Sequence, residues 1–94
     1  DLVITGEGRI DAQTSSGKVP VGVARKAKKY GVPVIAIVGS IGEGAESVYN
    51  HGIDAISDII HAPITLDQAM KDGISLIEKT AERMMRILDI RIRI

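Results

Sequence analysis

Glycines, charged side chains and hydroxyls gather in one stretch of this sequence, residues 6 to 19, which reads Gly-Glu-Gly-Arg-Ile-Asp-Ala-Gln-Thr-Ser-Ser-Gly-Lys-Val. Glycines let backbone N–H groups approach an anion, Arg and Lys neutralise its charge, and carboxylates orient a hydroxyl or hold a metal ion. Phosphoryl transfer requires this combination of anion-binding backbone, cationic side chains, carboxylates and hydroxyls. We therefore predict a long ligand-binding loop here, longer than the 2 to about 6 residues usual after a strand. The alternative is a capped surface loop in which Asp11 pairs with Arg9.

The charged residues of this stretch suit different tasks. Lys18 stands beside a predicted helix N-terminus, where a cation and free N–H groups together favour an anion. Arg9 could bind a carboxylate through two parallel hydrogen bonds. Glu7 and Asp11 are candidates for a base that deprotonates an attacking hydroxyl, or for a magnesium ligand.

A second glycine-rich stretch, residues 39 to 44, follows the next predicted strand and could form another anion nest, although glycine is also the ordinary residue of tight turns. Known phosphate-binding patterns nearly match the first stretch, residues 6 to 19, and then fail. The Walker pattern needs Gly in place of Ala12 and Ser or Thr in place of Val19, and the dinucleotide fingerprint needs Gly in place of Asp11.

The candidate catalytic residues are Asp11, Lys18 and Glu7, and the candidate substrate- and phosphate-binding residues are Gly6, Gly8, Arg9, Thr14, Gly17, Gly39 and Ser40.

Length and composition narrow the class of protein. The 94 residues suffice for one small domain, or for a piece of a larger one, and 45% of them are hydrophobic, enough to fill a core. Zero net charge and an aromatic content of 2% disfavour nucleic acid as a partner. The absence of cysteine excludes disulfides and suits a reducing cytoplasm. No apolar run is long enough to span a membrane.

Three β-branched runs, residues 2 to 5, 34 to 38 and 55 to 60, are predicted strands. They alternate with predicted helices over residues 20 to 30, 45 to 51 and 65 to 88. Pro20 suits a first turn, Gly31 a C-terminal cap, and Thr65 to Gln68 a capping box. This order predicts an α/β fold: a three-layer, Rossmann-like parallel sheet with helices on its faces. Because ligands bind beyond the carboxyl ends of such strands, the two glycine-rich stretches are the predicted site.

The ends of the sequence suggest an incomplete domain. It opens directly on a predicted strand without an initiating Met, and three strands make a thin sheet whose edges invite further strands. We expect the missing strands to come from upstream residues, and the isolated chain to associate with itself or with that segment. The alternating tail, residues 89 to 94, permits an edge strand but is more simply a disordered terminus.

The run from Asp1 to Asp11, with Gln13-Thr14, Gly17-Lys18 and residues 20 to 24, closely resembles the bacterial glycerate kinase family. Residues 33 to 37, Gly39-Ser40, residues 52 to 55 and the closing helix are also similar to that family. The resemblance extends to about Leu88, so that residues 1 to 88 are identified as a C-terminal segment of such an enzyme. Ser15-Ser16 before Gly17-Lys18 departs from the family pattern.

This resemblance implies a two-domain α/β enzyme that phosphorylates a hydroxyl of D-glycerate with ATP and Mg²⁺, giving phosphoglycerate. Its Thr-Gly-Glu-Gly-Arg-x-Asp and Gly-Lys signature falls on residues 5 to 11 and on Gly17-Lys18. The expected partners are D-glycerate, ATP and the rest of the protein's own chain, and the isolated segment is expected to be inactive. The alternative from another class is a non-catalytic module that binds a nucleotide or an anionic metabolite.

Overall fold

The computed structural model describes residues 1 to 16 and 19 to 93. Their contacts divide into two compact units, of which the first is Asp1–Asp58 and the second begins at Ile59. The first unit contains both glycine-rich stretches. The second contains the closing helices.

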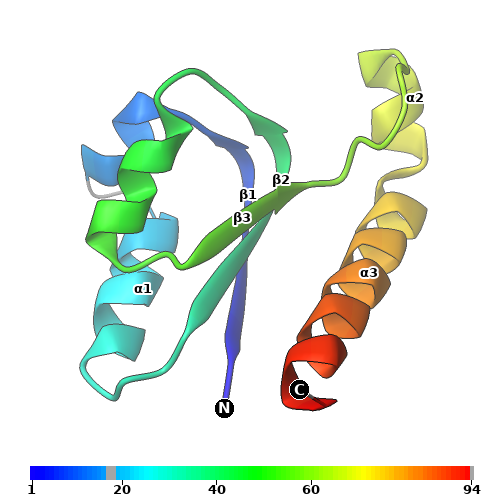
Figure 1. Cartoon of the computed structure of the whole chain (residues 1–94). Helices are drawn as coiled ribbons and strands as arrows, with labels where there is room; N and C mark the ends of the chain where they lie inside the picture. Colours follow the sequence, from blue (N-terminus) through cyan, green and yellow to red (C-terminus); the bar gives the residue numbers. More distant parts are fainter. Residues whose placement is uncertain (17–18, 94) are drawn as a thin grey trace. The chain divides into compact units, whose positions relative to one another are not determined.

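The first unit is built on a parallel sheet of three strands in the order β1-β2-β3 (Figure 1). Strand β1 is Val3–Ile10, β2 is Val34–Ile41 and β3 is Ala55–Asp58. β2 is the central strand because its continuously apolar sequence suits burial between two neighbours. The predicted α/β class and the parallel sheet are confirmed.

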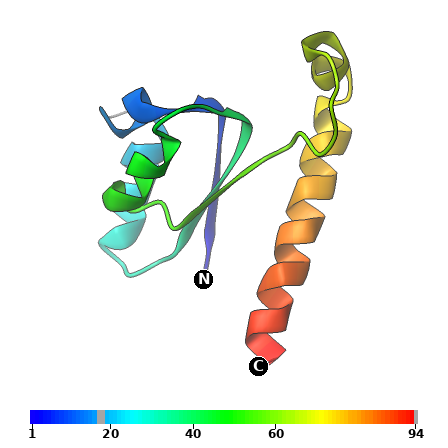
Figure 2. The same ribbon diagram turned by 45° about the horizontal axis from the view of Figure 1, so that its top comes forward.

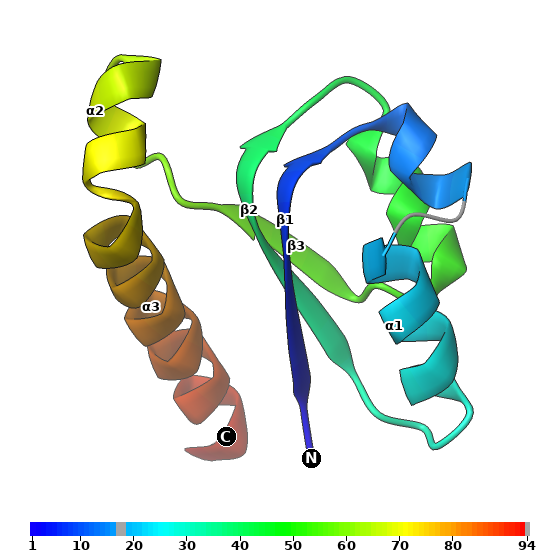
Figure 3. The same ribbon diagram turned by 180° about the vertical axis from the view of Figure 1, so that it is seen from behind.

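One face of this sheet is covered by helix α1, Val19–Lys28, and by two 3-10 helices, η1 at Ala12–Ser16 and η2 at Ala45–His51 (Figures 1 and 3). The core between these helices and the sheet is made of small and β-branched side chains. Its buried members are Ile10, Val21, Ala24, Ala27, Val34, Ala36, Val38, Ala45, Val48 and Ile53. Two glycines follow helical segments with left-handed backbones: Gly31, the predicted cap after α1, at φ 67°, and Gly52, directly after η2, at φ 97°.

Strand β1 is longer than predicted, so the expected loop over residues 6 to 19 is wrong in its first half. Gly6–Ile10 continue the strand in register with β2, and η1 follows at once. Glycine and charged residues have low β propensity, which made this segment look like a loop. Its backbone instead pairs with β2 as far as Ile10 opposite Ile41, a long-range pairing that overrides local preference.

The second unit holds helices α2, Leu66–Lys71, and α3, Gly73–Arg93 (Figure 2). Half of the predicted capping box is present, because the Thr65 hydroxyl accepts a hydrogen bond from the Gln68 amide at 3.1 Å, whereas the Gln68 side chain donates to Asp72 at 2.7 Å. The prediction of one continuous helix is wrong. The helix is interrupted at Asp72, directly before the first residue of α3, Gly73, because Asp favours caps and Gly costs about 1 kcal/mol inside a helix.

The end of the chain also differs from the prediction of an edge strand or a disordered tail. Residues 89 to 93 belong to α3, and Asp89 forms an ion pair with Arg93 at 3.1 Å. The alternating isoleucines and arginines contain no helix breaker, and an acid four residues before a base supports a helical turn. None of the helices in the described ranges is long and apolar enough to cross a membrane.

Candidate functional site

The two glycine-rich stretches meet at the carboxyl edge of the sheet, where β1 and β2 end side by side (Figure 3). The backbone joins them directly: the Gly42 amide donates to the Ile10 carbonyl at 2.6 Å, and the Ala12 amide donates to the Glu43 carbonyl at 3.1 Å. Parallel strands bring their carboxyl ends to the same edge of a sheet, so this juxtaposition follows from the topology. The structure thus brings the two glycine-rich stretches together at the carboxyl edge of the sheet, where the sequence predicts the site.

Arg9 is the cation at this edge that the structure describes. Its Nε lies 3.3 Å from Oδ2 of Asp11, and its Nη1 lies 3.5 Å from the Ser40 hydroxyl. The Arg9–Asp11 pair predicted as a feature of a surface loop is therefore formed, but it is formed at the end of β1, and the contact with Ser40 joins Arg9 to β2. The Arg9 side chain stays 60% exposed. A guanidinium has five N–H donors, so two contacts leave it able to bind an external oxyanion.

Asp11 uses both of its carboxylate oxygens. Oδ2 pairs with Arg9, and Oδ1 accepts a hydrogen bond from the Gln13 amide at 2.9 Å. Its own amide donates to the Thr14 hydroxyl at 3.1 Å, and Thr14 is fully buried. These reciprocal bonds cap the start of η1 in the manner of an N-terminal cap. Asp11 thus links the fold of η1 to the orientation of the Arg9 guanidinium.

Glu7 is the other carboxylate of the predicted catalytic set. It lies opposite Val38 in the sheet and is half-buried, and its Oε1 accepts a hydrogen bond from the Gly8 amide at 3.0 Å. No group of three or more metal-ligating side chains occurs within the described ranges. A single carboxylate that acts together with phosphate oxygens is still a usual magnesium environment.

The predicted glycines have different surroundings. A Cβ atom at Gly39 would lie 2.6 Å from the Gly8 carbonyl oxygen, so Gly39 is required by the close approach of the two strands. A Cβ at Gly6 would make an ordinary contact of 3.6 Å with the Ile37 carbonyl. A Cβ at Gly8 would meet no described atom within 4 Å, so packing against these residues does not explain that glycine.

Two predicted residues, Gly17 and Lys18, lie outside the described residues, and their roles stay predictions. Sequence reasoning also missed one residue, Gly42. It was noted only as one of three glycines between positions 39 and 44, yet it lies directly against Arg9 and Asp11. That glycine density was the available signal.

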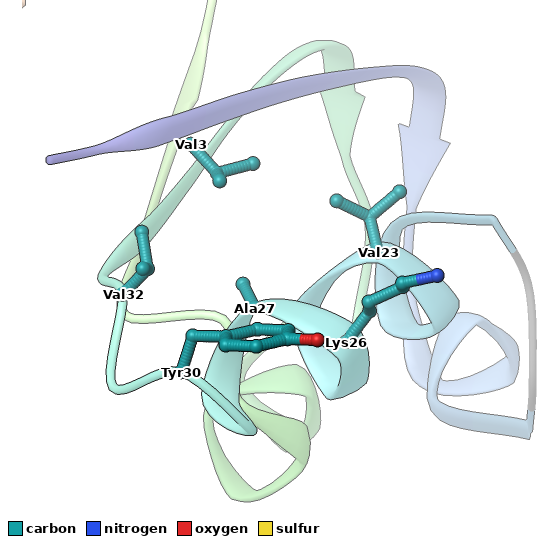
Figure 4. Close-up of a pocket in the computed structure, with 6 residues that line it drawn as sticks. All are labelled: Val3, Val23, Lys26, Ala27, Tyr30 and Val32. Carbon is teal, nitrogen blue, oxygen red and sulfur yellow. The ribbon is translucent and has the colours of Figure 1, made fainter.

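An apolar cavity of about 360 Å³ lies elsewhere in the first unit (Figure 4). Its lining includes two strand-side residues, Val3 at the start of β1 and Val32 before β2. Val23 and Ala27 of α1, and Tyr30 just after that helix, also line it. Since these strand residues lie at the amino ends, the cavity is at the opposite edge from Arg9. It lacks the converging polar groups that a phosphate-binding site needs.

A polar cluster of Asp54, Lys28 and the Val34 amide, called the clasp below, also lies at this amino edge. The Asp54 carboxylate pairs with the Lys28 ammonium at 2.5 Å and accepts a hydrogen bond from the Val34 amide at 2.7 Å. The hydrogen bond from Lys28, followed by that from Val34, holds the pKa of Asp54 below its usual value. The clasp ties α1 to the start of β2 and contributes to the fold that carries the site.

Fold and site together define an α/β protein with an oriented arginine and close-packed glycine turns at the carboxyl edge of a parallel sheet. The sequence matches the model of the "Glycerate kinase family" over residues 1–89. The chain belongs to that family. It is 57% identical over 84 residues to a glycerate kinase of Halalkalibacterium halodurans, an alignment that covers 89% of this chain and 22% of that protein.

Two further relatives carry similar names. A glycerate kinase of Bacillus subtilis is 53% identical over 81 residues, covering 86% of this chain and 21% of that protein. A glycerate 2-kinase of Escherichia coli is 46% identical over 92 residues, covering 98% of this chain and 24% of that protein. The chain therefore spans about a fifth to a quarter of the length of these curated relatives.

Proposed function

We propose that this chain works as part of a glycerate kinase, which transfers the terminal phosphoryl group of ATP to a hydroxyl of D-glycerate. The family match over residues 1–89 carries this proposal. The oriented Arg9 at the carboxyl edge adds physical support, because phosphoryl transfer depends mainly on positioning and charge neutralisation. The name of the Escherichia coli relative favours the hydroxyl on carbon 2 as the acceptor.

In the proposed reaction the glycerate hydroxyl oxygen forms a bond to the γ-phosphorus of ATP. The bond from that phosphorus to the β,γ-bridging oxygen breaks, ADP leaves, and a base takes the hydroxyl proton. Arg9 and Lys18 neutralise the negative charge of phosphate or of the substrate carboxylate. The contacts of Asp11 favour Glu7 as the carboxylate that faces the reacting groups, because both Asp11 oxygens already have partners within η1 and at Arg9.

Magnesium belongs to this proposal as the usual companion of ATP in kinases. When bound, it would neutralise phosphate oxygens and hold them in place. Glu7 is the described carboxylate that fits such an ion best, since Mg²⁺ in kinase sites keeps one or two protein carboxylates beside phosphate and water. Magnesium dependence of the ATP affinity, lost in Glu7→Gln, would support this assignment.

Gly8 fits the proposal as a point of close ligand approach. Its side-chain direction is open among the described residues, so an alanine there is compatible with their packing. A Gly8→Ala protein that folds normally but binds ATP or glycerate more weakly would place a ligand beside this backbone.

The direct test uses purified full-length protein with ATP, magnesium and D-glycerate, and measures ADP release together with phosphoglycerate formation by ³¹P NMR. We expect glycerate-dependent turnover that Lys18→Ala reduces by about a hundredfold, a scale typical of removing one group that stabilises transition-state charge. Gly22→Ala in α1 is the matched control, because a Cβ there meets no atom of the described residues within 4 Å.

Absence of glycerate-dependent turnover by a folded full-length protein would reject the kinase. Binding of ATP or glycerate without turnover would instead favour a non-catalytic nucleotide- or anion-binding module, which the same cationic edge also suits. The 94-residue chain alone should be inactive, because the family relatives are several times longer.

A further inference from the structure

The Arg9 guanidinium is held from more than one element. Asp11, just beyond β1, contacts Nε at 3.3 Å, and Ser40 of β2 contacts Nη1 at 3.5 Å. An exposed arginine normally samples many rotamers, and ordering it costs conformational entropy when a ligand binds. Contacts from two neighbouring strand ends lower that cost in advance.

Gly42, which has no side chain, leaves the space beside Asp11 in which the Arg9 guanidinium lies. A Cβ atom at position 42 would overlap Nη2 of Arg9, lie 2.8 Å from its Cζ, and lie 3.0 Å from Cβ of Asp11. The guanidinium therefore occupies the space that a side chain at position 42 would fill. The Gly42 amide, bonded to the Ile10 carbonyl at 2.6 Å, fixes this part of the turn against the end of β1.

Backbone strain does not account for glycine at this position. The described glycines with positive φ are Gly31, Gly44 and Gly52. Alanine at position 42 would keep the backbone hydrogen bond and a permitted conformation. Its main effect would be to displace the far end of a flexible, exposed side chain, which costs the fold little.

We propose that Gly42 is a positioning residue, whose missing side chain lets Arg9 lie as a preformed fork for an oxyanion of the substrates. This inference rests on the proposed function and extends it to a residue of the second glycine-rich stretch that was not among the predicted substrate-binding residues. The shared ligand chemistry is a pair of anionic oxygens, which either the carboxylate of the hydroxy acid or a phosphate group of ATP presents. A planar guanidinium binds both through parallel hydrogen bonds.

The test compares full-length wild-type protein with Gly42→Ala, and measures kcat, both KM values and the dissociation constants for D-glycerate and ATP by calorimetry. We expect Gly42→Ala to weaken one of the two ligands by about tenfold, the scale of one charge-assisted contact, with the other ligand and kcat little changed. Weaker glycerate identifies the carboxylate as the oxyanion, and weaker ATP identifies a phosphate. Gly22→Ala is the control for a methyl group added to glycine.

A double-mutant cycle separates positioning from general damage. Lysine at position 9 keeps the positive charge but lacks the guanidinium that a Cβ at position 42 would displace. Arg9→Lys should therefore weaken the same ligand, and Gly42→Ala should add little in the Arg9→Lys background. If Gly42→Ala does not fold, Ser40→Ala replaces it in the cycle, because it removes the Nη1 contact without adding volume.

Unchanged affinity for both ligands in the folded variant, or full additivity with Arg9→Lys, overturns the inference. These results are distinguishable from failure of the proposed function. If the proposed function fails, wild-type protein shows no turnover. The measured dissociation constants then still decide whether Gly42 acts through Arg9.

Discussion

The approach of β1 to β2 at Gly8 and Gly39 gives a quantitative prediction for Gly39→Ala. The added Cβ would lie 2.6 Å from the Gly8 carbonyl oxygen, whereas ordinary van der Waals contact begins at 3.4 Å. The obstructing atom is backbone within a hydrogen-bonded sheet, so no side-chain rotation relieves the overlap. The strands must separate locally by about 0.8 Å, the difference between those two distances.

Forcing extra volume into a packed region costs about 1–3 kcal/mol when the backbone has to shift. We expect Gly39→Ala to lower the free energy of unfolding of the full-length protein by that amount. Calorimetry of thermal unfolding, repeated at several scan rates, measures how far the substitution shifts the midpoint temperature of unfolding relative to wild type. Gly22→Ala is the control, and we expect it to be neutral or stabilising by up to about 1 kcal/mol, because alanine is a better helix former than glycine.

Gly39→Ala with wild-type stability would refute this reasoning. It would mean that β1 and β2 can separate at Gly8 without cost, and that Gly39 is not required by the sheet. The comparison is specific to packing because neither Gly39 nor Gly22 has a positive φ.

Two further predictions address charge. Asp54→Asn should destabilise the protein by about 1 kcal/mol at neutral pH, a figure reduced for the exposure of the Lys28 ion pair. The folded pKa of Asp54 is lowered, so this contribution is present above the unfolded pKa of about 3.9 and disappears as pH falls through the folded value. Urea unfolding at pH 7 and at pH 3 should therefore show a difference between variant and wild type that shrinks in acid, and a constant difference would contradict it. Asp11→Asn keeps the acceptor that caps η1 but removes the charge beside Arg9, so KM should rise about tenfold with a smaller change in kcat, whereas a fall in kcat of about a hundredfold or more would identify Asp11 as the base.

Local sequence determined much of this protein. The order of strands and helices, the left-handed Gly31 and Gly52 and the Thr65 cap each follow from a few neighbouring residues. The carboxyl-edge location of the site follows from that order, because consecutive parallel strands place their ends together. The signature over residues 5 to 11 was sufficient to indicate the family.

Tertiary structure decided what depends on partners distant in sequence. Residues 6 to 10 form a strand because β2 supplies the hydrogen bonds, although their own composition favours a loop. The close approach that requires Gly39, and the space beside Gly42 that Arg9 fills, exist only once β1 and β2 lie side by side. Local propensity acts over a few residues, whereas strand pairing and steric exclusion act between segments about thirty residues apart, and no pattern within either segment records them.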